Sequence, residues 1–181
     1  MPIFRLLAIM TLATHGIMTE LTNLSKTMLL RKATQADAEE ITNVYLVSRK
    51  KLPYAPLAHS DVEILHWIKE TLIPTNQVTV VENNSIIIGM MALSKTQDIG
   101  WIDQLYLLPE STGLGIGTML LNFAKNTLGS PMRLHTFQEN IQARRFYERH
   151  GFCIIALSDG SNNEERCPDM LYEWREDKAP R

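Results

Sequence analysis

The sequence has few cysteines and no long run of basic or apolar residues. Its two cysteines, Cys153 and Cys167, lie far apart without the spacing of metal ligands, so we expect neither a zinc site nor a disulfide framework. The longest basic run is Arg49-Lys50-Lys51, and the formal net charge is -2. Nucleic-acid binding depends on clustered Lys and Arg, so we expect no nucleic-acid partner.

The apolar segment near the start of the chain is short and interrupted. The stretch "FRLLAIMTLATHGIM" contains one basic residue and is broken by Thr, His and Gly. It is too short to span a bilayer and resembles a secretory signal only loosely. We therefore expect a cytoplasmic protein with no membrane partner, in which residues 1–27 are an extension that is either disordered or upstream of the true start.

The rest of the sequence predicts one domain, residues 28–176, followed by a short tail at 177–181. A chain of 181 residues that is 45% hydrophobic can bury one core of ordinary size. Alternation and turn residues predict strands at "MLLRKA", "QVTVVE", "SIIIGMMAL", "GWIDQLYLL", "MRLHTF", "FCIIAL" and "DMLYEW", with a hairpin turn at Asn83-Asn84. The predicted order, β-αα-βββ-α-β-α-ββ, is an α+β layout.

Capping residues mark the two helices between the first and second strands. Thr34 with Asp37 resembles a capping box before the first helix, and Ser60 with Glu63 resembles one before the second. Pro74 is predicted to stop the second helix, because proline cannot continue a helical hydrogen-bond ladder.

Three alternating glycines mark the stretch "LYLLPESTGLGIGTMLL", residues 105–121. A backbone N–H can approach a phosphate closely where no Cβ intrudes, and a helix N-terminus adds aligned donors. A strand, a glycine turn and a helix therefore predict an anion site. The stretch is not a P-loop, because Gly117-Thr118 lacks the lysine of that motif. It is not a dinucleotide fingerprint, because Gly113, Gly115 and Gly117 alternate strictly after a proline-containing linker.

This stretch resembles the coenzyme-binding motif of the GNAT family of acyl-CoA-dependent N-acyltransferases. That motif has an apolar-x-Pro element and then Gln/Arg-x-x-Gly-x-Gly/Ala at the start of a helix. Segments 107–109 and 112–117 follow it, except that Thr112 stands where Gln or Arg is usual. The departure removes a long side chain but leaves the backbone amides, so we expect weaker coenzyme affinity at worst.

A second motif, "NIQARRFYERHGF", is similar to the Asn-x-x-Ala-x-x-Phe-Tyr-Glu-x-x-Gly-Phe pattern of the same family. The resemblance covers about residues 28–174 and implies a GNAT-like fold, a mixed and mostly antiparallel central sheet flanked by helices. The segment "SDGSNNEERCPDMLYEW" further resembles the end of a bacterial subgroup of the family. Homodimers are common in that family, so a homodimer is a further expectation.

The resemblance implies acetyl-CoA as cosubstrate and no metal. By the same resemblance, the coenzyme-binding residues are Leu105, Leu107, Thr112, Gly113, Leu114, Gly115, Ile116, Gly117, Thr118, Asn140 and Phe146. Asn140 has a second interpretation as a plain helix N-cap, and both interpretations are compatible.

The resemblance also implies the catalytic residues Tyr147 and Asp103. Tyr147 would be the general acid for the coenzyme A thiolate, since a phenol with a pKa of about 10 can donate to a thiolate whose conjugate acid is near 8.5. A half-buried core tyrosine is the alternative. Asp103 lies on the strand before the glycines, shares a face with Leu105 and Leu107 if the strand alternates, and suits a base or a base–water relay. A strand-edge charge is the alternative for Asp103.

Substrate selection is expected in the variable segments "LPYAPLAHS" and "DGSNNEE". The adjacent acids Glu164 and Glu165 could attract a cationic acceptor, although solvation is the commoner role of such a pair. We expect direct transfer of an acetyl group to a primary amine of a small molecule or peptide in a ternary complex. A non-catalytic acyl-CoA-binding or sensor domain is the second class of function. It is kept open by two departures from the family pattern, Thr112 in place of Gln or Arg and Asp103 where many members have Glu.

Overall fold

The computed structural model describes residues 28–176, and the predicted N-terminal extension and C-terminal tail lie outside the described residues. The strands are β1 (Met28–Lys32), β2 (Gln77–Asn83), β3 (Ile86–Thr96), β4 (Ile99–Leu107), β5 (Met132–Phe137), β6 (Phe152–Ser158) and β7 (Asp169–Trp174). The helices are α2 (Ala38–Arg49), α3 (Asp61–Trp67), α4 (Ile73–Thr75), α5 (Ile116–Leu128) and α6 (Ile141–Arg149), with single turns η1 (Gln35–Asp37), η2 (Ile68–Leu72) and η3 (Pro109–Ser111). The predicted α+β order is confirmed.

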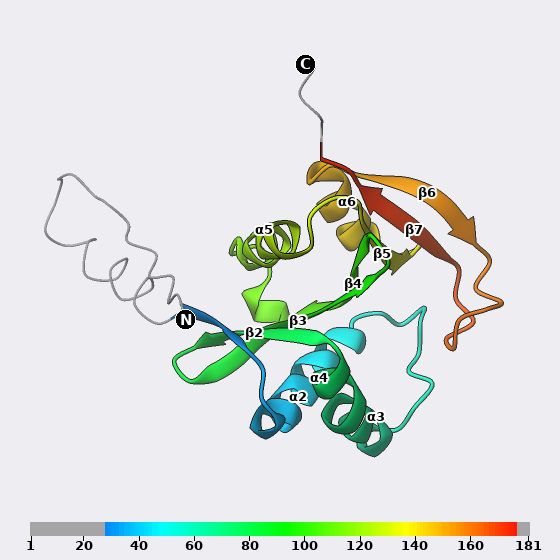
Figure 1. The fold of residues 1–181 in the computed structure, drawn as a ribbon. Helices are drawn as coiled ribbons and strands as arrows, with labels where there is room; N and C mark the ends of the chain where they lie inside the picture. Colours follow the sequence, from blue (N-terminus) through cyan, green and yellow to red (C-terminus); the bar gives the residue numbers. More distant parts are fainter. Residues whose placement is uncertain (1–27, 177–181) are drawn as a thin grey trace, which may run out of the picture.

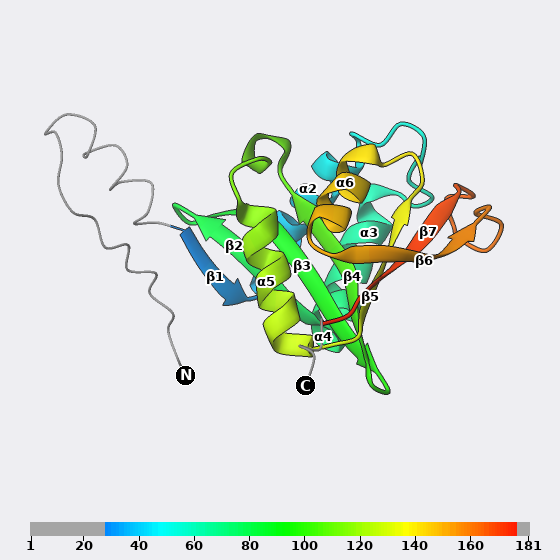
Figure 2. The same cartoon turned by 90° about the horizontal axis from the view of Figure 1, so that it is seen from above.

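The seven strands form one sheet in the order β1-β2-β3-β4-β5-β7-β6. All neighbours are antiparallel except β4 and β5, which run parallel and are joined by the crossover helix α5. Helices α5 and α6 lie on one face of the sheet, and α2, α3 and α4 lie on the other (Figure 1). Figure 2 shows α5 crossing above the strands of this sheet. The expected mixed, mostly antiparallel sheet flanked by helices is thus confirmed.

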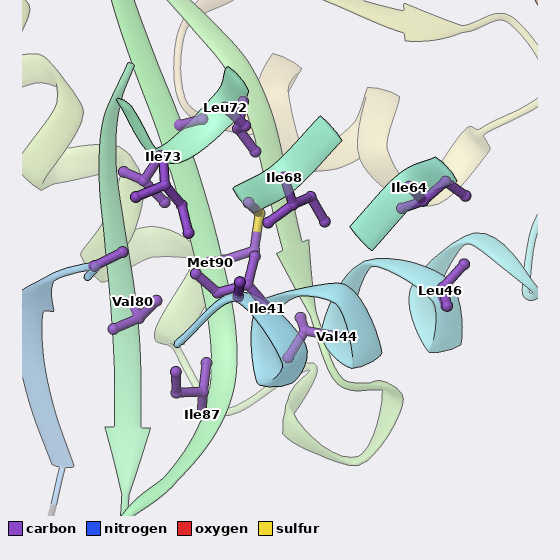
Figure 3. Packing of buried hydrophobic residues seen from close by; sticks show 14 of the residues in the cluster. Ile41, Val44, Leu46, Ile64, Ile68, Leu72, Ile73, Val80, Ile87 and Met90 are labelled. Carbon is purple, nitrogen blue, oxygen red and sulfur yellow. The ribbon is translucent and has the colours of Figure 1, made fainter. Parts of the chain in front are cut away.

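The sheet separates two apolar clusters. The first cluster lies between α2, α3 and the sheet (Figure 3), and its side chains include Ile41, Val44, Ile64, Ile68, Val80 and Met90. The second cluster lies under α5 and α6 and includes Met91, Ile116, Leu120, Leu134, Tyr147 and Tyr172. Successive residues of a strand point to opposite faces, so neighbours such as Met90 and Met91 in β3 belong to different clusters.

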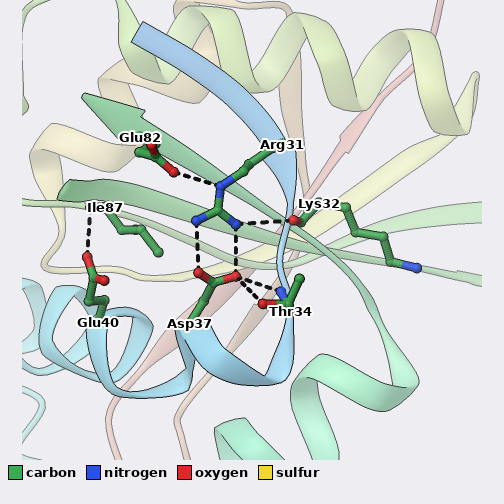
Figure 4. A network of polar contacts seen from close by, with 7 residues as sticks. All are labelled: Arg31, Lys32, Thr34, Asp37, Glu40, Glu82 and Ile87. Atoms are coloured by element: carbon green, nitrogen blue, oxygen red, sulfur yellow. Dashed lines mark hydrogen bonds and ion pairs between the residues drawn. The ribbon is translucent and has the colours of Figure 1, made fainter. Parts of the chain in front are cut away.

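A charged network fixes the start of α2 to strands β1 and β2 (Figure 4). Arg31 in β1 donates to both carboxylate oxygens of Asp37 at 2.8 Å and to Glu82 of β2 at 2.7 Å. The backbone N–H of Thr34 donates to Asp37 at 2.7 Å, as the predicted capping box requires. The guanidinium of Arg31 is the main reason why the pKa of Asp37 is lowered from 3.8 to about 2.

The helix from Asp61 follows the predicted cap but ends differently. Ser60 and Glu63 exchange hydrogen bonds between backbone N–H groups and side chains, which confirms the capping box. After Trp67 the helix passes through a π-helical turn, Ile68–Leu72, and ends at Thr75. Pro74, which was predicted to stop the helix, lies one residue before its end. The missing N–H of Pro74 is tolerated because the residue lies in the first turn of the short α4.

The β2–β3 turn also lies one residue later than predicted. Its central residues are Asn84 and Ser85, whose φ angles are 51° and 64°. A two-residue hairpin turn of type I′ needs positive φ at both central positions, which explains why the turn occupies this pair.

None of the helices in the part of the chain that the structure describes has the length and apolar character that a membrane crossing needs.

Candidate active site

The centre of the candidate site is the point where β4 and β5 separate. These strands pair only at Gly100 with Met132 and at Trp101 with Arg133. Farther along, neither strand has the other as its partner. Backbone N–H and C=O groups of a strand require hydrogen-bond partners, so an extended ligand can occupy the place of a strand there.

The glycine turn lies next to this separation, at the N-terminus of α5. Gly113 and Gly115 have φ angles of 78° and 81°, a region that costs other residues roughly 1–2 kcal/mol. No heavy atom lies within 4 Å of a Cβ built at either position. Residues 112–115 are all exposed, so the N–H groups at the start of the 13-residue helix α5 are accessible to an anion.

Gly117 is required for a different reason, the approach of α6. A Cβ at Gly117 would lie 3.2 Å from the ring of Phe146, which is closer than ordinary contact. Nearby, Thr118 Oγ1 and His150 Nε2 are 3.1 Å apart, and His150 Nδ1 lies 2.8 Å from the carbonyl oxygen of Phe146. The predicted coenzyme residues Gly117, Thr118 and Phe146 thus form one contact between α5 and α6.

The other predicted coenzyme residues on β4 and around the glycine turn differ in how exposed their side chains are. Thr112 Oγ1 donates to the Pro109 carbonyl at 2.7 Å, so the hydroxyl stabilises the turn that precedes the glycines. Leu114 is 64% exposed, whereas the Ile116 side chain is buried in the second cluster and only its backbone can meet a ligand. Leu105 and Leu107 are half-buried and pack against the same cluster.

Tyr147 lies on α6 among aromatic side chains of the second cluster. Its ring centroid is 5.2 Å from that of Phe146 and 5.7 Å from that of Phe152. Burial raises the pKa of its phenol above the ordinary value, so the group is protonated at neutral pH. Within residues 28–176 no hydrogen bond is formed by its hydroxyl, whereas neighbouring Tyr172 donates to Glu148 at 2.8 Å. Tyr147 is therefore both a core residue and an O–H donor without a partner in the described chain.

Asn140 is the N-cap of α6. Its Oδ1 accepts the backbone N–H of Ala143 at 3.1 Å, which confirms the N-cap interpretation. The cap occupies only the oxygen of the side-chain amide, so the Nδ2 group can still donate to a ligand.

Asp103 is the extra residue of a β-bulge. Ile102 pairs with Leu93 and Gln104 pairs with Ala92, the neighbour of Leu93, so no β3 residue lies opposite Asp103. The bulge interrupts the alternation of β4. The predicted common face of Asp103 with Leu105 and Leu107 rested on that alternation and does not follow from this register.

The carboxylate of Asp103 has polar neighbours. Asn76 Nδ2, just before β2, donates to it at 2.7 Å. Asp103 is exposed as a residue, but surrounding groups partly desolvate its carboxylate and raise its pKa, while hydrogen bonds from Ser94 and Asn76 oppose the rise. Asp103 thus lies next to the separation of β4 and β5 with a pKa above that of an ordinary aspartate.

One turn of α2 spans the separated strands from the other face of the sheet. The ring of Tyr45 packs on Tyr106 of β4 with centroids 5.0 Å apart. The guanidinium of Arg49 lies over the ring of Phe137 in β5, 5.2 Å from its centroid. Sequence analysis assigned Arg49 only to a basic run. The Tyr45–Arg49 spacing of four residues, which places both on one helix face, is the signal it could have used.

The adjacent acids of the β6–β7 loop have different partners. Glu164 and His59 are exposed and lie 3.0 Å apart. Glu165 instead pairs with the buried Arg49 at 2.6 Å. The expectation that these acids are merely solvated holds for Glu164. It is wrong for Glu165, because this residue forms an ion pair with Arg49 at the end of α2.

Two tryptophans, Trp67 and Trp101, pack against aromatic neighbours. Trp67 meets Tyr45 edge-on at 6.1 Å, and Trp101 stacks on His135 at 5.9 Å.

Among residues 28–176 no group of three or more His, Cys, Asp or Glu is arranged to hold a metal ion. The open glycine turn fits a pyrophosphate, and the separated strands fit the extended arm of coenzyme A.

Comparisons with known proteins agree with this geometry. The model of the acetyltransferase (GNAT) family matches residues 31–152. PaiA N-acetyltransferase from Thermoplasma acidophilum, solved with coenzyme A, is similar in fold: TM-score 0.65, 24% identity, 83% of this chain and 99% of that chain. Naa50 from Arabidopsis thaliana, solved with a bisubstrate analogue, gives a TM-score of 0.64 at 20% identity over 81% of this chain and 97% of that chain.

A third similar structure is yncA from Salmonella typhimurium with its cofactor acetyl-CoA. Its TM-score is 0.62 at 19% identity, and the match covers 86% of this chain and 98% of that chain. No curated protein sequence matches this chain. The family model covers well over half of the sequence, including the glycine turn and the Tyr147 helix. The chain therefore belongs to the GNAT family of acetyltransferases, enzymes that use acetyl-CoA.

Proposed function

We propose that this enzyme transfers the acetyl group of acetyl-CoA to a primary amine by direct attack, with both substrates bound at once. The separation of β4 from β5 carries the proposal. The glycine turn of α5 borders this separation on one face of the sheet, and Tyr45 and Arg49 of α2 border it on the other. A thioester and an amine can therefore approach one point from opposite faces.

Coenzyme binding is proposed to rest on backbone groups. The N–H groups at the start of α5 point toward the exposed turn formed by Gly113 and Gly115, and the positive end of the helix dipole favours a pyrophosphate. The Nδ2 group of Asn140 can donate to the amide-containing arm of the coenzyme. Thr112 contributes through the turn that it stabilises, since its hydroxyl is bound to Pro109.

Tyr147 is proposed as the donor to the leaving sulfur. Acetyl-CoA supplies an acetyl thioester, and its leaving group is a thiolate. Complete proton transfer from a phenol of pKa about 10 to a thiolate of conjugate acid about 8.5 would cost about 2 kcal/mol. Burial raises the pKa of Tyr147 further, so its O–H stabilises the thiolate chiefly as a hydrogen-bond donor.

Asp103 is proposed to accept the amine proton, directly or through water. At pH 7 deprotonating a lysine-like amine costs roughly 4.6 kcal/mol, whereas an α-amine with a pKa near 7.8 costs only about 1 kcal/mol. The raised pKa of Asp103 makes it a better base than an aspartate of ordinary pKa. An α-amine needs only such a weak base.

The test is thiol release from acetyl-CoA with a panel of α-amine peptides, amino acids, lysine-like amines, polyamines and aminoglycosides. We expect release that depends on an acceptor and that falls in the Tyr147→Phe variant. Heat protection by acetyl-CoA, measured in parallel, reports coenzyme binding. Protection without release for any amine would contradict amine acetylation and favour the acyl-CoA-binding class.

A further inference from the structure

The end of α2 contains a buried cation with unused hydrogen-bonding capacity. The Arg49 side chain is only 2% exposed. Its Nη2 atom donates to Glu165 at 2.6 Å and makes a long contact of 3.4 Å with the Ala55 carbonyl. Its Nε atom is buried, and no residue of the described chain accepts its hydrogen. A buried guanidinium normally has its donors satisfied, so the Nε donor of Arg49 can accommodate a further acceptor.

A second buried donor without a partner lies beside it. The hydroxyl of Tyr54 is buried and forms no hydrogen bond with any residue of 28–176. The Tyr54 ring packs edge-on against Phe137 at 6.2 Å, and Arg49 lies over the same Phe137 ring. The two buried donors without acceptors therefore belong to side chains that contact the same ring, that of Phe137 at the end of β5.

Glu165 is the more exposed partner in its ion pair with Arg49. It is 21% exposed and comes from the β6–β7 loop, 116 positions along the chain from Arg49. The buried Arg49 belongs to α2, whereas Glu165 belongs to a loop and keeps part of its side chain in solvent. A carboxylate that arrives from solvent can take the position of the Glu165 carboxylate without displacing a core residue.

We propose that the amine acceptor carries a carboxylate, which replaces Glu165 on Arg49 and accepts from Tyr54. A carboxylate offers two oxygens and about four acceptor positions, enough for the forked donors of Arg49 and a phenol. The acceptor class is an amino acid or a similar amine with a nearby acid group. This inference rests on the proposed function, because it places the acceptor on the α2 side of the separated strands.

Location supports the assignment. Ser48, the residue before Arg49, donates to the Leu107 carbonyl at the end of β4 at 2.7 Å. Arg49 and Ser48 thus contact the ends of both separated strands. Once the Glu165 carboxylate is displaced, a cationic polyamine would meet the positive charge of Arg49 there, whereas the carboxylate of an amino acid would pair with it.

Binding of reaction products separates the carboxylate from amine basicity. N-acetyl amino acids with apolar, polar, acidic and basic side chains, and their primary amides, carry no ionisable amine at the α-position. Calorimetry with the full chain saturated with coenzyme A should detect binding of at least one acid, with its amide bound at least about tenfold more weakly. Equal binding of acid and amide would overturn the proposal.

Variants assign the effect to this cluster. Arg49→Lys should weaken binding of the acid about tenfold or more, and Tyr54→Phe should weaken it a few-fold without lowering stability, since that hydroxyl has no partner to lose. Glu165→Gln should tighten binding of the acid, because the competing carboxylate is gone. Glu82→Gln, which removes one acid from Arg31, is the matched control and should change nothing. Acid binding that is weakened by Glu165→Gln, or unaffected by Arg49→Lys, would also overturn the proposal.

Thiol release distinguishes this inference from the proposed function. Acetylation of amines that lack a carboxylate, with no preference for amino acids, would sink the carboxylate proposal and leave amine acetylation intact. Absence of release from every amine, while acetyl-CoA still protects against heat, would sink both. Preference for amino acids that is lost in Arg49→Lys, with coenzyme affinity unchanged, would support both.

Discussion

The Asp37→Asn variant tests how strongly the charged network holds the start of α2. Asp37 accepts hydrogen bonds from Arg31 and Thr34, and its pKa is lowered from 3.8 to about 2. A difference of about 1.8 pKa units (3.8 minus 2) between unfolded and folded states corresponds to about 2.4 kcal/mol of stability at neutral pH. We expect Asp37→Asn to lower the free energy of unfolding by about 2 kcal/mol at pH 7.

The sign of the pH dependence makes this prediction specific. Because the pKa of Asp37 is lower in the folded state, its contribution is complete well above 3.8 and is lost as the pH falls toward 2. At pH 3 roughly half of the contribution is left. Urea unfolding of both proteins should therefore show a stability difference that shrinks by about 1 kcal/mol between pH 7 and pH 3. A difference that stays constant would refute the reasoning, and Asp98→Asn in the exposed β3–β4 turn is a control expected to have little effect.

Further predictions concern the site. Gly117→Val should abolish coenzyme binding measured by calorimetry, because its side chain would meet the Phe146 ring 3.2 Å from the first added carbon; retained binding would contradict the requirement for this close contact between α5 and α6. Tyr147→Phe should lower kcat about tenfold or more with little change in acetyl-CoA affinity, since only the O–H is removed; unchanged turnover would mean that the thiolate leaves unaided. Thr112→Arg should tighten coenzyme binding a few-fold, and an unaltered Kd would mean that the backbone amides suffice. Asp103→Asn should remove the acidic limb of the pH profile of kcat/KM, which the raised pKa of Asp103 moves above the ordinary aspartate range; an identical profile would exclude Asp103 as the base.

Local signals were enough to predict most of the fold. Capping boxes at Thr34 and Ser60, and the alternation of apolar residues in the strands, are properties of a few adjacent residues. The bulge at Asp103 could not be predicted in the same way, because a bulge is defined by how two strands pair. The π-helical turn before α4 is likewise a matter of hydrogen-bond register, which the apolar pattern does not encode.

The two sides of the site also differ in whether local sequence predicts them. The glycine turn is formed by consecutive residues, and the structure has the positive φ values that Gly113 and Gly115 allow. The α2 side depends on Arg49 and Glu165, which are 116 positions apart and have no local signal that pairs them. The sequence therefore predicted the glycine turn but not the buried cation on the α2 side of the sheet.

The sheet also separates the proposed coenzyme-binding side of the site from the proposed acceptor side. The glycine turn and Tyr147 are supported by the second apolar cluster, whereas Tyr45 and Tyr106 pack against the first cluster on the opposite face. In the proposed function, changes to the packing of α2 and α3 would thus reshape the surroundings of the acceptor with little effect on the residues proposed to meet the coenzyme. If this proposal holds, substitutions in one layer can change the acceptor while the other layer keeps its binding of acetyl-CoA.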